Sequence, residues 1–341
     1  MTLILALETS CDDTCAAVVT SDGDLRSNVI SSQGIHDAYG GVVPEIASRH
    51  HLELANAAVD DALRRAGATL DDVGLVAVTQ GPGLVGALLV GVATAKGLAA
   101  ARGLPLAPVD HLQGHVAANF LRLDSGAQAP IMEPPFVCLL ASGGHTLLAR
   151  VEDHDGFAVL GRTLDDAAGE AFDKGARLLG LPFPGGPALE RLARDGDPQA
   201  FAFPIARNLA GLDFSFAGVK TALLYRIRDL AAAGAAGAAR DQAADLAASY
   251  QRAIVEALAL RCEQALEQTG VQRLAIGGGV AANGPLRVRL AALGIPLGIP
   301  PRELCTDNAA MIASAARYVQ AQPFPDYLAL DAYASGERAL A

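Results

Sequence analysis

LILALETSCDDTCAAVV, residues Leu3–Val19, decides the fold of this chain. Its first five residues form an apolar strand, Glu8–Thr14 form a polar turn, and Cys15–Val19 form a second strand. A short turn leads to a third strand, Leu25–Ile30. The stretch therefore predicts a three-stranded meander whose first turn is polar.

The same pattern of strands and turns recurs far downstream. Strand Phe136–Leu140, turn Ala141–Thr146, strand Leu147–Val151 and strand Phe157–Arg162 follow in the same order. Each meander opens one half of the chain, which predicts an internal duplication with a period of about 130 residues. We therefore expect an α/β protein with two pseudo-symmetric lobes and a central cleft. The lobes are predicted at residues 1–130 and at residues 131–341, the second with a helical insertion.

The later parts of the halves also correspond. The first half is predicted to continue with helix 43–66, strand 75–79, helix 84–101 and strand 106–109. The second is predicted to continue with helices 166–179 and 240–268, strand 273–276, helix 285–293, strand 296–299 and helix 309–320. Strands of both halves should then end at the cleft, where open α/β sheets place their ligands.

Two histidines follow the last strand of the first half, in DHLQGH at residues 110–115. His111 and His115 are four residues apart, so a helix places both rings on one face, and such a pair can bind Zn²⁺ or Fe²⁺ given a third ligand. Asp307 occupies nearly the matching place in the second half, so we expect it to reach the histidines from the other side of the cleft. The alternatives are a solvated or core histidine pair and an Asp307 that only caps a helix.

Three turns are rich in backbone N–H groups and poor in large side chains, namely Glu8–Thr14, Ala141–Thr146 and Gly277–Gly284. Glycine lets the main chain approach a phosphate closely. At equivalent corners of two repeats, these turns resemble the nucleotide loops of the actin-like ATPase superfold. A P-loop motif and a strand-placed dinucleotide motif are absent from the sequence.

Composition narrows the function classes. The chain has 341 residues, is 51% hydrophobic and carries a formal net charge of −11. An acidic protein is not expected to bind nucleic acid without a partner protein, because phosphate contacts need a basic surface. Five cysteines without paired spacing indicate free thiols. Leu84–Ala101 is interpreted as a buried helix rather than a membrane span. Ala231–Ala239 is interpreted as a surface segment or helix tip. We expect a cytoplasmic protein without a membrane partner.

Longer phrases resemble the TsaD family of tRNA threonylcarbamoyltransferases, in matching order over residues 3–320. The phrases that carry the resemblance are Glu8–Thr14, Gly40–Arg49, Gly81–Gly86, His111–His115, Ser142–Thr146, Asp165–Lys174, Pro184–Pro187, Asp213–Phe216 and Cys305–Asn308.

The resemblance implies the actin-like ATPase fold and transfer of threonylcarbamoyl from L-threonylcarbamoyladenylate to N6 of adenosine 37 in tRNAs that read ANN codons. It implies one Fe²⁺ per subunit, with Zn²⁺ as the alternative, bound by His111, His115 and Asp307. It places an acidic residue beside the reacting centre at Asp12. The implied substrate contacts are Leu140, Ala141, Ser142, Gly143, Gly144, Asp173, Gly186 and Asn283. ATP or ADP could occupy the same cleft.

The implied partners are tRNA, a TsaB-like paralogue and a TsaE-like ATPase. This chain departs mildly from the family pattern at two positions. Gln113 stands where family members often have an acidic residue, and Asp13 stands where glutamate is usual. A metalloprotease is disfavoured because Leu112 follows the first histidine where zincins place a glutamate. A small-molecule carbamoyltransferase or kinase and a nucleotide-binding regulatory scaffold of the same superfold remain as alternatives.

Overall fold

The computed structural model describes residues 1–39, 41–123, 132–232 and 242–334. The chain divides into two compact units. The first comprises Met1–Pro134, Val151–Phe157 and Pro300–Ala341, and the second comprises Pro135–Arg150 and Ala158–Ile299. The division into domains at residue 130 stays a prediction, and contacts assign residues 300–341 to the first unit. Most of the predicted surface segment Ala231–Ala239 lies outside the described residues.

The first unit contains a five-stranded sheet in the order β3-β2-β1-β4-β5. Its strands are β1 (Leu3–Glu8), β2 (Asp13–Thr20), β3 (Leu25–Ser32), β4 (Val73–Gly81) and β5 (Leu106–Asp110). The strands β1, β2 and β3 pair in antiparallel fashion, and β4 and β5 continue the sheet in parallel with β1. The predicted meander is confirmed.

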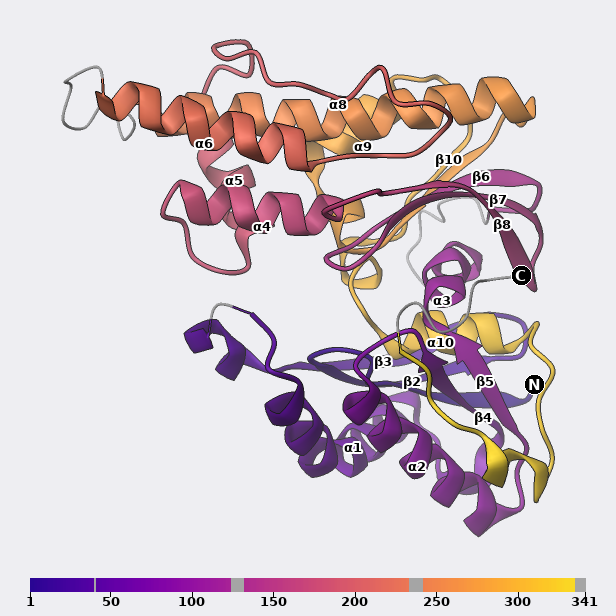
Figure 1. Cartoon of the computed structure of the whole chain (residues 1–341). Helices are drawn as coiled ribbons and strands as arrows, with labels where there is room; N and C mark the ends of the chain where they lie inside the picture. The colour runs from indigo at the N-terminus through magenta and orange to yellow at the C-terminus, as the bar shows by residue number, and fades with distance from the viewer. Residues whose placement is uncertain (40, 124–131, 233–241, 335–341) are drawn as a thin grey trace. The chain divides into compact units, whose positions relative to one another are not determined.

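Helices cover both faces of this sheet, which explains why β1 is almost continuously apolar. The α-helices are α1 (Pro44–Ala66), α2 (Val85–Arg102), α3 (His111–Ala117) and α10 (Ala309–Ala316). Shorter 3₁₀ turns are η1 (Gly34–Tyr39), η2 (Leu70–Asp72), η3 (Ala118–Phe120), η5 (Arg302–Leu304) and η6 (Asp326–Ala329). Figure 1 shows α1 and α2 side by side on one face and α10 on the other.

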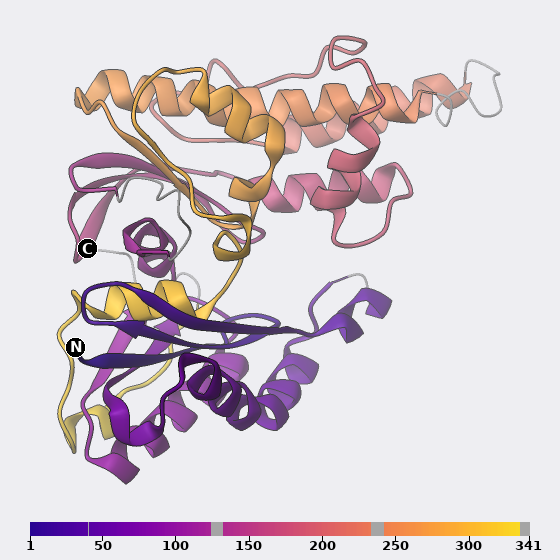
Figure 2. The same ribbon diagram turned by 180° about the vertical axis from the view of Figure 1, so that it is seen from behind.

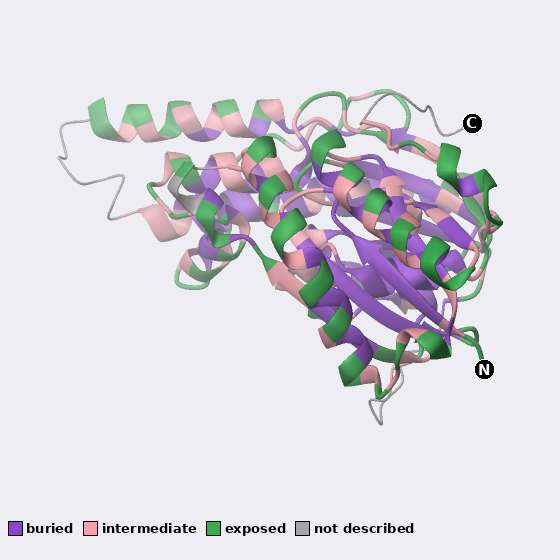
Figure 3. Ribbon diagram, turned by 90° about the horizontal axis from the view of Figure 1, so that it is seen from below, coloured by how far each residue is buried: buried purple, intermediate pink, exposed green. Residues whose placement is uncertain are grey.

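The main core of the first unit lies between the sheet and the pair α1 and α2. Leu5, Val76 and Val92 are among its buried members, and Figure 3 shows much of the strand ribbon of this unit as buried. The helix α2 is long and apolar enough to cross a membrane by length and composition alone. It packs on α1 and β4, while Leu89 on its outer side is exposed. The predicted burial of this helix therefore holds for one face.

The second unit repeats the sheet of the first. Its strands are β6 (Phe136–Ala141), β7 (Thr146–Asp153), β8 (Gly156–Arg162), β9 (Leu274–Gly277) and β10 (Leu297–Gly298). Their order, β10-β9-β6-β7-β8, is that of the first sheet with each strand replaced by its counterpart. The strands β6, β9 and β10 pair in parallel. The predicted duplication is confirmed at the level of the two sheets.

Five described helices accompany the second sheet. They are α4 (Ala168–Leu178), α5 (Gly185–Ala193), α6 (Ala217–Ala232), α8 (Ala243–Thr269) and α9 (Gly284–Ala291), with the 3₁₀ turn η4 (Gly279–Ala282) before α9. The helix α8 is the longest and packs against α4, α5, α6 and α9. Sequence patterns did not predict α5 or α6.

Candidate metal centre

The helix α3 presents the two predicted histidines from a capped start. Asp110 is its N-cap, and one carboxylate oxygen, Oδ1, accepts hydrogen bonds from the backbone N–H of Leu112 at 2.8 Å and of Gln113 at 3.1 Å. His111 and His115 are both buried, at 5% and 1% exposure. Their ring centroids are 4.8 Å apart. The predicted spacing therefore brings two imidazoles to one buried face.

Asp307 lies just before α10, in the same unit as the histidines. The prediction that it reaches them from the opposite lobe was wrong. Its helix explains the difference, because every residue of α10 is buried and the helix packs on β1, β2 and α3 of the first unit. The N-cap of α10 is Asn308, which accepts a hydrogen bond from the N–H of Met311 at 2.9 Å. Asp307 is thus not the cap of this helix.

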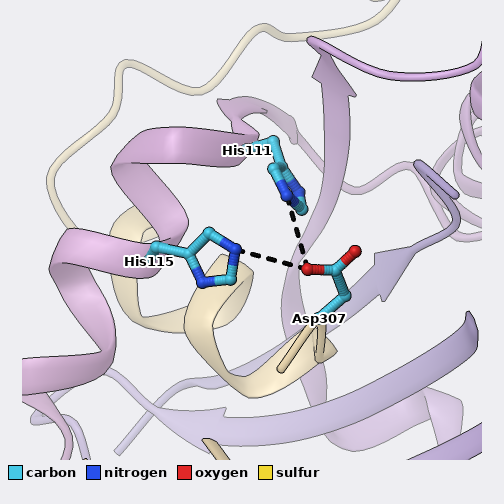
Figure 4. A group of neighbouring side chains, drawn as sticks. All are labelled: His111, His115 and Asp307. Carbon is cyan, nitrogen blue, oxygen red and sulfur yellow. Dashed lines mark ion pairs between the residues drawn. The ribbon is translucent and has the colours of Figure 1, made fainter. Parts of the chain in front are cut away.

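The three side chains converge on one point (Figure 4). The Asp307 Oδ1 atom lies 3.5 Å from Nε2 of His111 and 3.3 Å from Nε2 of His115. Their ligand atoms all lie within 4.8 Å of one another. Two imidazoles and one carboxylate form a set that divalent Fe or Zn uses when other coordination positions stay open for substrate.

His115 gives an independent sign that the set suits a metal. Both of its ring nitrogens are buried and make no hydrogen bond among the described residues, and Nε2 faces the Asp307 carboxylate at 3.3 Å. A buried polar atom without a partner destabilises a fold by about 1–3 kcal/mol. A metal ion on Nε2 would satisfy one of these two nitrogens, so the residues present fit the metal that the sequence predicted.

Glu8 supports His111 from behind. The Nδ1 atom of His111 lies 2.9 Å from Oε2 of Glu8, which is completely buried at the end of β1. Thr79 donates to the same oxygen, and the N–H of Ser10 donates to the other oxygen of this carboxylate. A carboxylate that holds Nδ1–H leaves Nε2 as the metal ligand. Sequence patterns did not indicate this role, although a glutamate that ends an apolar strand was the available signal.

Charge pairing explains the protonation of these groups. Burial acts to raise the pKa of Glu8, but the charge and hydrogen bond of His111 outweigh it and lower that pKa. Burial acts in the opposite direction on His111, and the carboxylates of Asp307 and Glu8 overcome it to raise the pKa of His111 to about 9. In the absence of a metal ion the pair therefore favours its charged forms, and a metal ion bound at Nε2 of His111 would displace the proton from that nitrogen.

Asp12 lies in the turn after β1, Asp13 begins β2, and both are partly buried. Burial raises the pKa of Asp13 to about 6, and the neighbouring Asp12 adds to this effect. Asp12 stays the predicted catalytic residue. The structure draws attention to Asp13 as well, because a carboxyl group whose pKa lies near neutrality is suited to proton transfer.

A chain of buried side chains holds this turn. The Nε2 atom of His51 lies 3.0 Å from the carbonyl oxygen of Cys11, so it carries the proton and donates. Its Nδ1 atom accepts, from the hydroxyl of Thr14 at 2.8 Å and from Nε2 of Gln33 at 3.4 Å. His36 lies 3.0 Å from the amide oxygen of Gln33. Because every donor faces an acceptor, the chain fixes one neutral tautomer of His51.

The predicted phosphate turn lies in the second unit. Leu140 and Ala141 end β6 and are buried, Ser142 is half-buried, and Gly143 and Gly144 are exposed. The N–H of Ser142 donates to the carbonyl of His145 at 2.7 Å, which closes the turn. A Cβ atom at Gly143 or Gly144 would meet nothing within 4 Å. These two glycines are therefore not needed for internal packing.

The three other predicted substrate residues gather around α5. Asp173 accepts hydrogen bonds from the N–H groups of Gly185 at 2.8 Å and Gly186 at 3.3 Å. Burial raises the pKa of Asp173, and these bonds oppose the rise. The Asn283 amide donates to Glu190 of α5 at 3.1 Å and to Gln251 at 2.9 Å.

Asn283 is also the N-cap of α9. The described contacts already occupy both N–H groups of this amide and one lone pair of its oxygen, so Asn283 has a structural role in any account of the site. Its contact with a nucleoside stays a prediction.

The two sheets and their helices define the class of protein. A solved structure of full-length HypF matches 93% of this chain and 46% of its own length with a TM-score of 0.58 at 14% identity. Component A of the (R)-2-hydroxyglutaryl-CoA dehydratase of Acidaminococcus fermentans matches 93% of this chain and 96% of its own with a TM-score of 0.53 at 15% identity. The chain has the actin-like ATPase fold, as predicted, with a His-His-Asp set on its first unit.

Comparisons of sequence identify the family. The family model described as TsaD, tRNA N6-adenosine threonylcarbamoyltransferase, matches residues 24–314. The protein of that name from Symbiobacterium thermophilum is 52% identical over 93% of this chain and 91% of its own length, and that from Moorella thermoacetica is 51% identical over 93% and 92%. The chain belongs to the TsaD family.

Proposed function

We propose that this chain transfers the threonylcarbamoyl group from L-threonylcarbamoyladenylate to N6 of adenosine 37 in tRNAs that read ANN codons, and that it releases AMP. The observation that carries the proposal is the set formed by the buried His111 and His115 and the half-buried Asp307. Glu8 supports this set, in a chain about half identical to transferases of this name over nearly its full length. The 52% identity extends over 93% of the chain, which favours the complete transfer reaction rather than binding of the adenylate alone.

The metal is proposed to be one Fe²⁺ per subunit, with Zn²⁺ as the alternative, held by Nε2 of both histidines and by Asp307. When bound, a divalent cation with open positions can polarise a carbonyl oxygen or neutralise a phosphate. Glu8 keeps the proton of His111 on Nδ1 and so keeps Nε2 directed at the ion. The burial of His111 and His115 keeps water away from the ligand nitrogens.

Other residues bind the adenylate and move the proton in this proposal. Gly143 and Gly144 are exposed residues on a closed turn, where their backbone N–H groups are proposed to bind a phosphate. Attack by the adenine amine requires that a proton leave the nitrogen, and Asp12 is proposed to accept it. His51 holds the carbonyl of Cys11, next to Asp12, and thereby fixes the turn that carries this carboxylate.

Partners are proposed from the same family. The tRNA is the acceptor substrate, and the acidic charge of −11 favours a binding surface shared with other proteins. A TsaB-like paralogue is proposed as a protein partner. A TsaE-like ATPase is proposed as a further partner, and ATP or ADP as ligands of the adenylate site.

Turnover with purified components tests the function. The chain, together with its partners, is incubated with threonylcarbamoyladenylate and unmodified tRNA, and the digested tRNA is analysed for N6-threonylcarbamoyladenosine. The proposal predicts one modified adenosine per tRNA and release of an equal amount of AMP. Binding of the adenylate without any modified nucleoside would instead favour the regulatory scaffold, and transfer to a small amine but not to tRNA would favour the small-molecule carbamoyltransferase.

A further inference from the structure

The chain does not end at α10 but continues as a segment, Gln320–Ala334, that we call the C-terminal strap. Figures 1 and 2 show it in yellow along the edge of the first unit. It starts beside the edge strand β5, where Gln322 and Leu106 exchange two backbone hydrogen bonds of 2.8 and 3.0 Å. Tyr327 is completely buried in the core of this unit, and Leu330 packs against that core. The first part of the strap is thus firmly anchored.

The second part of the strap is tied to α2 and to the end of β4. Lys96 of α2 donates from Nζ to the carbonyl oxygens of Leu328 at 2.9 Å and Leu330 at 2.5 Å. Gln80 donates from its amide to the carbonyl of Asp331 at 2.8 Å. The N–H of Tyr333 donates in return to the carbonyl of Gln80 at 3.2 Å. These bonds lead the strap to the loop that follows β4.

Tyr333 reaches from there to the cap of α3. Its hydroxyl lies 2.6 Å from Oδ2 of Asp110 and 3.0 Å from the carbonyl oxygen of Gly81. The other oxygen of Asp110 is the one that caps α3. A single carboxylate therefore joins the strap to the first turn of the helix, and His111 is the next residue after it. A charged acceptor and a hydroxyl donor form a short, strong hydrogen bond.

The loop beside this contact is shaped to admit the strap. Gly81 has a φ of 157°, and a Cβ atom there would lie 2.4 Å from the carbonyl oxygen of Tyr333. A side chain at Gly81 would displace the strap, which gives a physical reason for glycine in the Gly81–Gly86 phrase. The contact between Tyr333 and the end of β4 is therefore a close-packed feature of the first unit.

We propose that Tyr333 is a positioning residue for the metal centre. Its hydroxyl fixes Asp110, Asp110 fixes the first turn of α3, and this turn sets the direction in which His111 offers Nε2. The C-terminal strap thereby tunes metal affinity, although no residue of the strap is a proposed ligand. The inference rests on the proposed metal centre and adds to it a control exerted by the end of the described chain.

A matched pair of variants within the strap tests this role. Tyr333→Phe removes the hydroxyl that binds Asp110. Tyr327→Phe makes the same chemical change six residues earlier, at a hydroxyl that has no hydrogen-bond partner among the described residues. Residues that hydrogen-bond directly to a metal ligand typically change affinity 10- to 100-fold, and Tyr333 acts one contact further out, through Asp110. We therefore expect a rise of up to about 10-fold in the dissociation constant for Zn²⁺ with Tyr333→Phe and no change with Tyr327→Phe.

The measurements are a competition titration of the full chain with Zn²⁺ against a chromophoric chelator and the visible absorption spectrum of the Co²⁺-loaded protein. Tyr333→Phe should alter the Co²⁺ bands and speed amide exchange at Leu112 and Gln113, whereas Tyr327→Phe should leave both as in the parent chain. Asp110→Asn keeps a capping oxygen but removes the charge. In that background Tyr333→Phe should have little further effect, because the two residues act in one path.

Four results separate the possible failures. A parent chain that binds neither Zn²⁺ nor Co²⁺ would reject the metal centre itself. A parent chain that binds metal, with an unchanged dissociation constant and spectrum in Tyr333→Phe, would reject the role of the strap and leave the centre intact. The path through Asp110 would also be overturned if Tyr333→Phe and Tyr327→Phe lowered Zn²⁺ affinity equally. It would likewise be overturned if Tyr333→Phe lowered Zn²⁺ affinity as much in the Asp110→Asn background as in the parent chain.

Discussion

At the residue scale, the most direct prediction concerns the three proposed metal ligands, His111, His115 and Asp307. Each is proposed to form one bond to the metal. Alanine at any one of them should lower metal content sharply, by more than the 10- to 100-fold that outer contacts contribute. Glu8→Gln keeps a hydrogen-bond acceptor for His111 but removes the charge, so its loss should fall within that smaller range. Elemental analysis of purified variants measures the effect.

The control for these variants is His50→Ala, which removes a half-exposed histidine of α1. It should retain the metal content of the parent chain. Full metal occupancy in all three ligand variants would show that the His-His-Asp set is not a metal centre.

Asp12 and Asp13 are adjacent carboxylates, and their variants assign the proton acceptor. If Asp12 accepts the amine proton, Asp12→Asn should lower kcat by about 10²- to 10⁴-fold and leave KM and metal content nearly unchanged. Asp13→Asn is the matched control and should change kcat far less. Steady-state transfer assays with tRNA measure both. A large loss in Asp13→Asn alone would move the role to Asp13, and its pKa of about 6 should then appear in the pH dependence of kcat/KM.

At the scale of elements, the turn between β1 and β2 depends on His51 of α1. Burial lowers the pKa of His51, although its hydrogen bond to Cys11 and the nearby carboxylates of Glu8 and Asp12 oppose this. The folded protein then binds fewer protons than the unfolded chain below a pH of about 6.5, the ordinary value for histidine. Stability contributed by neutral His51 is therefore present above about pH 6.5 and is lost as the pH falls below it.

Denaturant unfolding between pH 5 and 7.5 measures this contribution. We expect the free energy of unfolding to fall toward low pH in the parent chain and to fall less steeply in His51→Gln. The variant should also be less stable at pH 7.5 by about 1–3 kcal/mol, because it disrupts buried hydrogen bonds. His50→Gln, one residue earlier, serves as the control and should behave like the parent. Identical slopes in the parent and His51→Gln would contradict the neutral tautomer.

Sequence patterns predicted most of these elements, for reasons visible in single residues. The strands β1 and β6 are apolar runs that end in polar or glycine-rich turns, so their bounds agree with the structure to within one residue. The helix α5 was missed because it begins with Gly185, Gly186 and Pro187, which are typical of a turn. Its tie to Asp173 is a contact between elements that a local pattern does not contain.

At the scale of the whole molecule, the duplication was visible in the sequence but the assignment of α10 was not. The topology of the two sheets follows from the repeated meander and the strands after it. The chain order alone placed Asp307 in the second half, whereas its wholly buried helix packs on the first sheet. The support of His111 by Glu8, and the path from Tyr333 to Asp110, join residues more than 100 positions apart and became visible only in three dimensions.

The acidic charge of the whole chain fits a transferase that shares its tRNA with partners, and a test in cells keeps those partners present. Cells depleted of this protein receive the parent gene, the His115→Ala gene or the His50→Ala gene, and the nucleosides of their tRNA are quantified. N6-threonylcarbamoyladenosine should disappear on depletion, return with the parent and with His50→Ala, and stay absent with His115→Ala. Normal levels of this nucleoside in the depleted cells, or full restoration by His115→Ala, would contradict the account.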